Sequence, residues 1–296
     1  MSFDTHFSDR LAARIQQIES RLVVGIDPRL DRLPAAIGAD DPEQALSQLG
    51  EGVIEAVAEH AAAVKPQVAF FERHGWRGWR ALETVCASAA RAGIPVILDA
   101  KRGDIGSTAE AYAEALLGDE PGTLGPHVDA LTVNPYLGSD SLVPFLARVN
   151  DHGKGIFVLA RTSNPGSAEF QCRDDDAVPI FEQVARSAER WGQDSIGECG
   201  FHGVGLVVGA TYPDEIVKVR QAAPGSIFLI PGVGAQGGSI DDLAAAFDDS
   251  GLGAVVNSSR GIVQAFEQDL ERPWQELVQE AARDTRLALQ GVSSAG

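Results

Sequence analysis

The chain has 296 residues, and its 42 acidic residues outnumber its 24 lysines and arginines, which gives a formal net charge of −18. Nucleic acids and anionic membranes bind proteins through a basic footprint, so this balance argues against both as partners. Hydrophobic residues make up 44% and charged residues 22%, as in an ordinary globular protein. The length suits either two domains or a single α/β barrel of about 250 residues.

Three cysteines without C-x-x-C spacing predict neither a disulfide framework nor a structural zinc site. The N-terminal segment lacks the apolar core of a secretory signal. No stretch reaches the roughly 18 uncharged apolar residues that a membrane-spanning helix needs. We therefore expect a soluble, cytoplasmic protein.

Eight short apolar runs rich in β-branched residues recur along the chain, each nearly continuous rather than alternating. Such runs are typical of parallel strands that are covered on both faces. The predicted strands are 22–27, 62–68, 95–100, 130–135, 155–160, 204–210, 227–233 and 253–259. A helix is expected near the N-terminus, and segments of helical period lie between the strands, including 42–63, 106–117, 178–196 and 241–250.

Eight strands that alternate with helices predict a (β/α)8 TIM barrel. A doubly wound open sheet is the alternative, but it would be expected to carry a glycine fingerprint after the first strand, where this chain has GIDPRL. The sequence shows no linker and no internal repeat. We therefore expect one barrel domain over 1–296, with a frayed tail from about 291.

In a barrel, the catalytic residues lie where the strands end. The polar residues at the predicted strand ends are Asp27, Lys65, Asp99, Lys101, Asn134, Arg161, Ser163, Ser258 and Arg260. Two of the four lysines of the chain are among them. A lysine can deliver a proton that an arginine retains, so this placement favours a chemical role. A composition that favours arginine explains why lysine is scarce but not where it stands.

The segment PVILDAKRGDIGSTAEAYA at 95–113 carries the densest cluster of charge. Asp99 and Lys101 are two residues apart on a predicted strand, so both side chains should point into the barrel mouth. Asp104 follows in the turn. Two carboxylates would keep the lysine between them protonated and would repel a substrate carboxylate. A surface salt-bridge cluster is the alternative interpretation.

The motif Asp99-x-Lys101-x-x-Asp104 resembles the D-x-K-x-x-D signature of the orotidine 5′-phosphate decarboxylase family, and LDAKRGDIGSTAEAYA is similar to its longer bacterial subclass (type 2). The resemblance extends over nearly the whole chain, through LVVGIDPRL, VKPQVAFFE, PGVGAQGG and NSSRGI. It implies decarboxylation of orotidine 5′-phosphate to UMP and CO2 in pyrimidine biosynthesis, without a metal or another cofactor.

Two alternatives stay open beside that function. A metal-dependent sugar-phosphate lyase of the same barrel superfamily shares the D-x-K-x-x-D motif, but such relatives look to have an acidic metal ligand where this chain has Lys65. A non-catalytic nucleotide-binding homologue is the other alternative.

The resemblance also implies roles for individual residues. The catalytic tetrad would be Lys65, Asp99, Lys101 and Asp104. Lys101 would donate a proton to C6 of the pyrimidine, and Asp99 would crowd the substrate carboxylate. Asp104 and Thr108 would reach the neighbouring subunit's site in a homodimer with shared active sites. Gly106 stands where the commoner subclass has proline, so the start of this helix, and with it the role of Thr108, is expected to differ.

Substrate-binding residues follow from the same resemblance. Asp27 and Lys65 would bind the ribose hydroxyls, and Ser163 would contact the pyrimidine edge. Gln236 would fold over the phosphate, and Arg260 would pair with it. Residue types allow simpler alternatives, because Asp27 precedes a proline as turn residues often do, and Ser163 could be an ordinary loop serine.

The phosphate end can also be argued from the residues themselves. A glycine-rich turn at 231–239 follows the seventh predicted strand, and NSSRGI at 257–262 follows the eighth. Loops at these two places form the recurrent phosphate site of α/β barrels, because glycine exposes backbone N–H groups and helix N-termini attract anions. The sequence therefore predicts that the substrate carries a phosphate.

Overall fold

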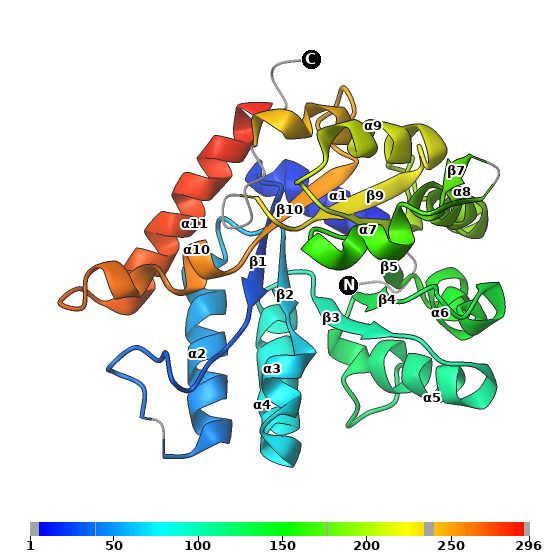
Figure 1. The fold of residues 1–296 in the computed structure, drawn as a ribbon. Helices are drawn as coiled ribbons and strands as arrows, with labels where there is room; N and C mark the ends of the chain where they lie inside the picture. Colours follow the sequence, from blue (N-terminus) through cyan, green and yellow to red (C-terminus); the bar gives the residue numbers. More distant parts are fainter. Residues whose placement is uncertain (1–5, 39, 176, 234–239, 293–296) are drawn as a thin grey trace.

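The computed structural model describes residues 6–38, 40–175, 177–233 and 240–292. Eight parallel strands form one sheet: β1 (Leu22–Ile26), β2 (Ala63–Pro66), β3 (Ile97–Arg102), β4 (Ala130–Val133), β5 (Gly155–Arg161), β8 (His202–Val208), β9 (Ser226–Ile230) and β10 (Ala254–Ser258). Their order is β2-β1-β10-β9-β8-β5-β4-β3 (Figure 1). Parallel bridges Val64–Val96 and Gln67–Asp99 join the two outermost strands, so the sheet closes. The predicted barrel is confirmed, and the open sheet is excluded.

Helices surround the barrel on the outside (Figure 1). They are α2 (Pro42–Val57), α3 (Val68–Glu72), α4 (Gly75–Arg91), α5 (Gly106–Leu117), α6 (Val143–His152), α7 (Ala168–Gln171), α8 (Ile180–Gly192), α9 (Pro213–Ala222), α10 (Arg260–Val263) and α11 (Trp274–Gln290). Apart from the short α7, which buries none of its residues, their apolar faces pack on the outward-facing residues of the strands. Among the described residues, no helix combines the length and the hydropathy that a membrane span requires.

The N-terminal helix α1 (Phe7–Ile18) closes the end of the barrel where the strands begin. Its buried residues Phe7, Leu11 and Ile15 pack on inward-facing side chains, and the rings of Phe7 and Phe157 meet edge to face at 5.9 Å. Gly155 leaves room for this contact, because a Cβ there would lie 2.3 Å from the Phe7 ring. The opposite end, where the strands finish, is the mouth of the barrel.

One expectation about local structure is wrong. The helix predicted at 241–250 is a short 3-10 helix, Asp241–Ala246. It ends because the Asp248 carboxylate accepts hydrogen bonds from the backbone N–H groups of Ser250 and Leu252, which builds a turn in place of a helix. Val292, in the segment expected to fray from about 291, is buried against the outer core. Residues 293–296 lie outside the described residues.

Candidate active site

Strand β3 departs from regular pairing where the charged cluster begins. Leu98 pairs with Leu131 of β4 and Arg102 pairs with Val133, so three residues of β3 lie between these pairs where β4 has one. Lys101, inside this bulge, has φ +48°, a left-handed conformation that costs a side-chain-bearing residue about 1–3 kcal/mol. Its backbone N–H donates to Thr132 Oγ1 at 2.9 Å instead of to a strand carbonyl.

Asp99 is the centre of the cluster and is only 6% exposed. Four donors saturate its carboxylate: Lys65 Nζ at 2.6 Å and Gln67 Nε2 at 2.9 Å on Oδ2, and Lys101 Nζ at 2.5 Å and Thr132 Oγ1 at 3.0 Å on Oδ1. The expectation that Asp99 and Lys101 meet in the mouth is confirmed, although a bulge rather than a regular strand brings them together. We call Lys65, Gln67, Asp99, Lys101 and Thr132 the Asp99 cluster.

The electrostatics of the Asp99 cluster keep its central group charged. Burial by itself would raise the pKa of the Asp99 carboxyl, but the charges of Lys65 and Lys101 outweigh it and hold that pKa well below its usual range. Asp99 is therefore an anion at neutral pH. Lys65 is as deeply buried as Asp99, whereas the Lys101 side chain is 46% exposed toward the mouth. The cluster therefore offers one accessible ammonium group backed by a fixed negative charge.

Sequence reasoning missed two members of the Asp99 cluster. Gln67 stands two residues after Lys65, so the same alternation that aims Lys65 inward aims Gln67 inward as well. Thr132 is the polar residue inside the apolar run ALTV of β4, and it is 1% exposed. The alternation that places Gln67 and the lone polar residue Thr132 could both be seen in the sequence. The partner that each side chain contacts depends on the closure of the barrel.

Two acceptor oxygens in the mouth have no partner. Asp27 Oδ1, after β1, and Asn257 Oδ1, on β10, are both buried and make no hydrogen bond to any described residue. Buried polar atoms are normally hydrogen-bonded. Because β1 and β10 are paired neighbours, these two acceptor oxygens without partners indicate a site for hydrogen-bond donors such as sugar hydroxyls. Sequence analysis singled out Asp27 and did not single out Asn257.

The residues predicted for the phosphate lie partly within the described structure. Arg260 begins α10 directly after β10 and is exposed. Within the described ranges its guanidinium has no hydrogen-bond or ion-pair partner, so it is available to an anion. Gln236 lies outside the described residues, as does most of the glycine-rich turn at 231–239.

In the part of the chain that the structure describes, neither Asp104 nor Thr108 forms a hydrogen bond or ion pair with the Asp99 cluster. The Asp104 carboxylate accepts from the backbone N–H of Ile105 at 2.8 Å and, among the described residues, forms no ion pair with Lys65 or Lys101. Thr108 is exposed on the first turn of α5. That helix begins at Gly106 with φ +52°, which proline cannot adopt, so the departure from the commoner subclass has a structural reason.

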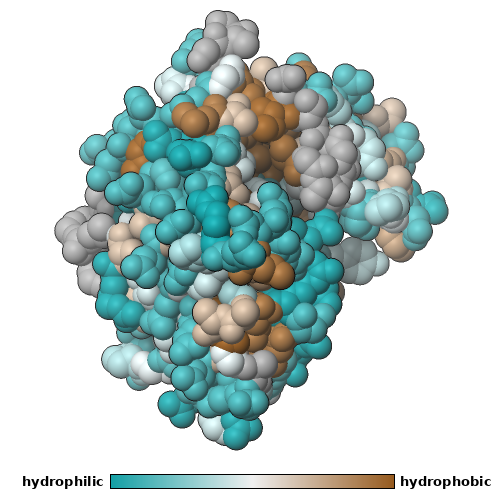
Figure 2. Space-filling view, turned by 90° about the vertical axis from the view of Figure 1, so that its left-hand side faces the viewer, coloured by the Kyte–Doolittle hydropathy of each residue, from teal (hydrophilic) through white to brown (hydrophobic). Residues whose placement is uncertain are grey.

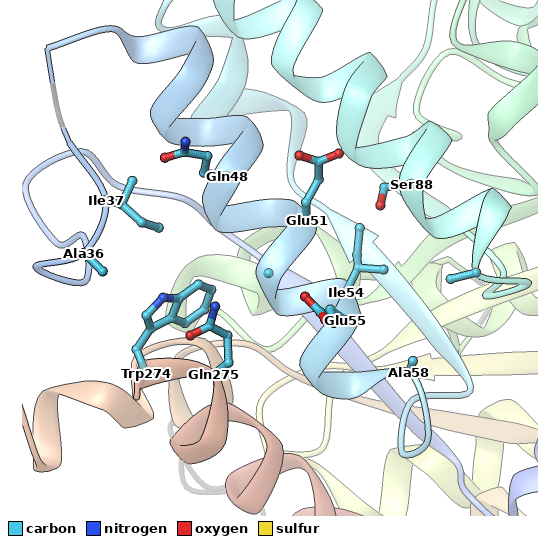
Figure 3. A pocket seen from close by; sticks show the side chains of 12 residues that line it. Ala36, Ile37, Gln48, Glu51, Ile54, Glu55, Ala58, Ser88, Trp274 and Gln275 are labelled. Carbon is cyan, nitrogen blue, oxygen red and sulfur yellow. The ribbon is translucent and has the colours of Figure 1, made fainter. Parts of the chain in front are cut away.

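A large cavity elsewhere does not involve these residues. It is an open hollow of about 700 Å³ on the outside of the barrel between α2, α4 and α11, lined among others by Trp274, Gln275 and Glu55 (Figure 3). This side of the molecule is mostly hydrophilic, with a few small hydrophobic patches (Figure 2). None of the predicted site residues lines the cavity, so the barrel mouth stays the candidate active site.

Known proteins that are similar to this chain show which family it belongs to. The model of the orotidine 5′-phosphate decarboxylase/HUMPS family matches residues 20–271. The chain belongs to this family. A curated orotidine 5′-phosphate decarboxylase from Rhodopirellula baltica is 44% identical over 96% of this chain and 99% of its own length. One from Haloarcula marismortui is 46% identical over 90% of each chain.

Solved structures agree with this membership. The structure of Leishmania donovani OMP decarboxylase matches with a TM-score of 0.78 and 38% identity, covering 98% of this chain and all of the other. The resemblance read from the D-x-K-x-x-D motif is confirmed at the level of family, and with it the carboxy-lyase class of enzyme.

Proposed function

We propose that the chain decarboxylates orotidine 5′-phosphate to UMP and CO2, and that Lys101 supplies the proton. The observation that carries this proposal is the Asp99 cluster: a saturated, buried carboxylate beside an accessible ammonium group. A substrate carboxylate placed beside Asp99 is repelled by its negative charge. The lone pairs of the Asp99 oxygens are already occupied by hydrogen bonds within the cluster. Loss of CO2 removes that repulsion, so the site stabilises the transition state relative to the bound substrate.

The reaction can be written with these groups. The C6–carboxylate bond breaks, CO2 leaves, and the electron pair stays on C6 as a carbanion. The Lys101 ammonium group stabilises this charge as it develops and then donates a proton to C6, which forms the C–H bond of UMP and leaves a neutral amine. Solvent returns the proton to Lys101 through the open mouth.

Other residues of the mouth orient the substrate in this proposal. The orphaned oxygens of Asp27 and Asn257 accept from ribose hydroxyls, next to Lys65 on the neighbouring strand. Ser163, after β5, contacts the pyrimidine edge, and Arg260 pairs with the phosphate. Gln236 is proposed to cover the phosphate. These contacts hold C6 beside Lys101, and such positioning is itself a large part of catalysis.

A homodimer with shared sites is part of the proposal. Exposed apolar side chains follow strand β3 next to Asp104 (Ile105) and follow its neighbouring strand β4 (Tyr136 and Leu137). Exposed apolar surface of this kind marks interaction sites. A second copy that covers this face would bury it and bring Asp104 to the partner's ribose. The cytoplasm is the proposed location, as for a biosynthetic enzyme of nucleotides.

The proposed activity is tested by following the pyrimidine absorbance of orotidine 5′-phosphate with purified protein. Turnover that continues in EDTA is expected. No change in absorbance at saturating substrate would refute the activity, and loss of turnover on chelation would favour the metal-dependent lyase. Tight binding of UMP without turnover would favour the non-catalytic alternative.

Shared sites are tested by mixing two inactive variants, Lys101→Ala and Asp104→Ala. In an equal mixture of exchanging dimers, half are mixed, and each has one intact site if Asp104 acts on the partner. The mixture should then recover about a quarter of wild-type activity. No recovery in a mixture shown to have exchanged subunits would refute sharing.

A further inference from the structure

Arg161 is the last residue of β5 and is 1% exposed, although it carries a full positive charge. Leu159 pairs with Val207 of β8 and Arg161 pairs with Val208, so β5 contains one extra residue at this point. Val207 faces the barrel interior and Val208 faces the helices. The bulge therefore turns Arg161 out of the barrel and into the layer between strands and helices.

In that layer Arg161 joins two loops of the mouth. Its guanidinium donates to Glu215 Oε2 and lies 3.8 Å from the ring centre of Tyr212. It also donates to Ser167 Oγ, to the Thr162 carbonyl at 3.1 Å and to Gln171 Oε1 at 3.5 Å. Tyr212 and Glu215 belong to the segment that links β8 to α9 and to the first turn of α9. The other partners belong to the segment from β5 to α7. The cation thus ties the β5 loop to the β8 loop.

The segment held in this way contains Ser163. Gln171 accepts from the Thr162 backbone N–H at 2.9 Å and donates to Thr162 Oγ1 at 2.8 Å. On the other side, Gly209 donates its N–H to the Arg161 carbonyl at 2.7 Å. A Cβ on Gly209 would lie 3.0 Å from the backbone and Cβ of Ser163, so the two loops are in direct contact. Ser163 has little freedom to shift.

We propose that the Arg161–Glu215 ion pair is a positioning device that fixes Ser163 and thereby sets the selectivity for the pyrimidine base. The inference rests on the proposed function, in which Ser163 contacts the pyrimidine edge. Arg161 touches no substrate and acts through Ser163. Its planar guanidinium serves Glu215, Ser167 and the Tyr212 ring at once, which a lysine ammonium group cannot do.

The experiment compares Arg161→Lys and Glu215→Gln with wild type in binding UMP and ribose 5-phosphate, which lacks the base. Loss of one well-placed hydrogen bond to the base is expected to lower the affinity for UMP about tenfold, while the affinity for ribose 5-phosphate stays unchanged. The KM for orotidine 5′-phosphate should rise by a similar factor, with kcat within about threefold of wild type. The double variant should bind UMP no more weakly than the weaker-binding single variant, because each substitution breaks the same Arg161–Glu215 ion pair.

Arg220→Lys is the matched control. Arg220 is also a partly buried arginine over an aromatic ring, 3.7 Å from Phe228, but it donates to backbone carbonyls near the starts of β9 and β10. Its replacement should lower thermal stability without changing the preference for UMP over ribose 5-phosphate. If Arg161→Lys fails to fold, Glu215→Gln and Tyr212→Leu carry the same comparison.

Three results separate the possibilities. Equal weakening of UMP and ribose 5-phosphate in a folded variant would overturn the inference, since it would mean a general loosening of the site. Unchanged UMP binding in folded Arg161→Lys and Glu215→Gln would overturn it as well. A wild-type protein that neither turns over orotidine 5′-phosphate nor binds UMP would instead refute the proposed function.

Discussion

Thr132→Val removes one hydroxyl from the Asp99 cluster and keeps the shape of the side chain. The hydroxyl donates to Asp99 Oδ1 at 3.0 Å and accepts from the Lys101 backbone N–H at 2.9 Å. A hydrogen bond to a charged group contributes about 1.5–3 kcal/mol, and an unsatisfied backbone N–H costs about 1–3 kcal/mol. Lys101 is held in a left-handed conformation that this second bond supports. The valine variant should therefore release Lys101 from the position that the chemistry needs.

We expect the free energy of unfolding to fall by about 2–4 kcal/mol, measured by urea denaturation. If about 2 kcal/mol of that loss is expressed in the transition state, kcat falls about thirtyfold, measured from the pyrimidine absorbance. Thr84→Val is the matched control, because Thr84 Oγ1 donates to the Arg80 carbonyl within α4, far from the mouth. A Thr132→Val enzyme that loses stability but keeps kcat within twofold of wild type would refute the role given to Thr132.

Two further predictions concern the opposite end of the barrel. Burial lowers the pKa of His202 although Glu189 opposes the shift, so the imidazole is neutral in the folded protein. The stability that the neutral imidazole contributes is present above its ordinary pKa of 6.5. It is lost as the pH falls through the lowered value. In urea titrations between pH 7 and 5, His202→Asn should lose less stability than wild type, and equal losses would contradict this. Gly155→Ala should destabilise the fold by about 1–3 kcal/mol, because its Cβ would lie 2.3 Å from the Phe7 ring. Gly291→Ala, where the nearest atom is 3.6 Å away, is the control, and equal urea midpoints for the two variants would contradict the role of α1.

Much of the fold could be predicted from local pattern. Each of the eight apolar runs became a barrel strand, and the helix predicted at 106–117 has those bounds. The failure at 241–250 is also informative. Its alanines favour a helix, but the turn that Asp248 builds with two backbone N–H groups ends the segment early. Helical propensity was visible in the sequence, whereas the competing side-chain-to-backbone bonds depend on local geometry.

The site was only partly predictable. Spacing brought Asp99 and Lys101 together, and the lysine count drew attention to Lys65. The bulge at Lys101 and the contact from Thr132 depend on pairing between β3 and β4, which residue types alone do not specify. The orphaned oxygen of Asn257 is recognisable only once the barrel has closed and its neighbours are known. Long-range closure, rather than local pattern, therefore completes the site.

The same distinction applies to Asp104. Its motif position was recognised from sequence, yet among the described residues its carboxylate forms no hydrogen bond or ion pair with the Asp99 cluster. Whether it acts on a partner's substrate is a question of assembly, and the mixing experiment addresses it.

A Lys101→Arg variant tests whether Lys101 delivers the proton to C6. Arginine keeps the positive charge beside Asp99 but does not release a proton near neutral pH. The measurement is single-turnover decarboxylation of orotidine 5′-phosphate, with the affinity for UMP measured on the same sample. We predict a rate at least about a thousandfold below wild type, with UMP affinity kept within about tenfold. A Lys101→Arg enzyme that decarboxylates within tenfold of the wild-type rate would contradict the account.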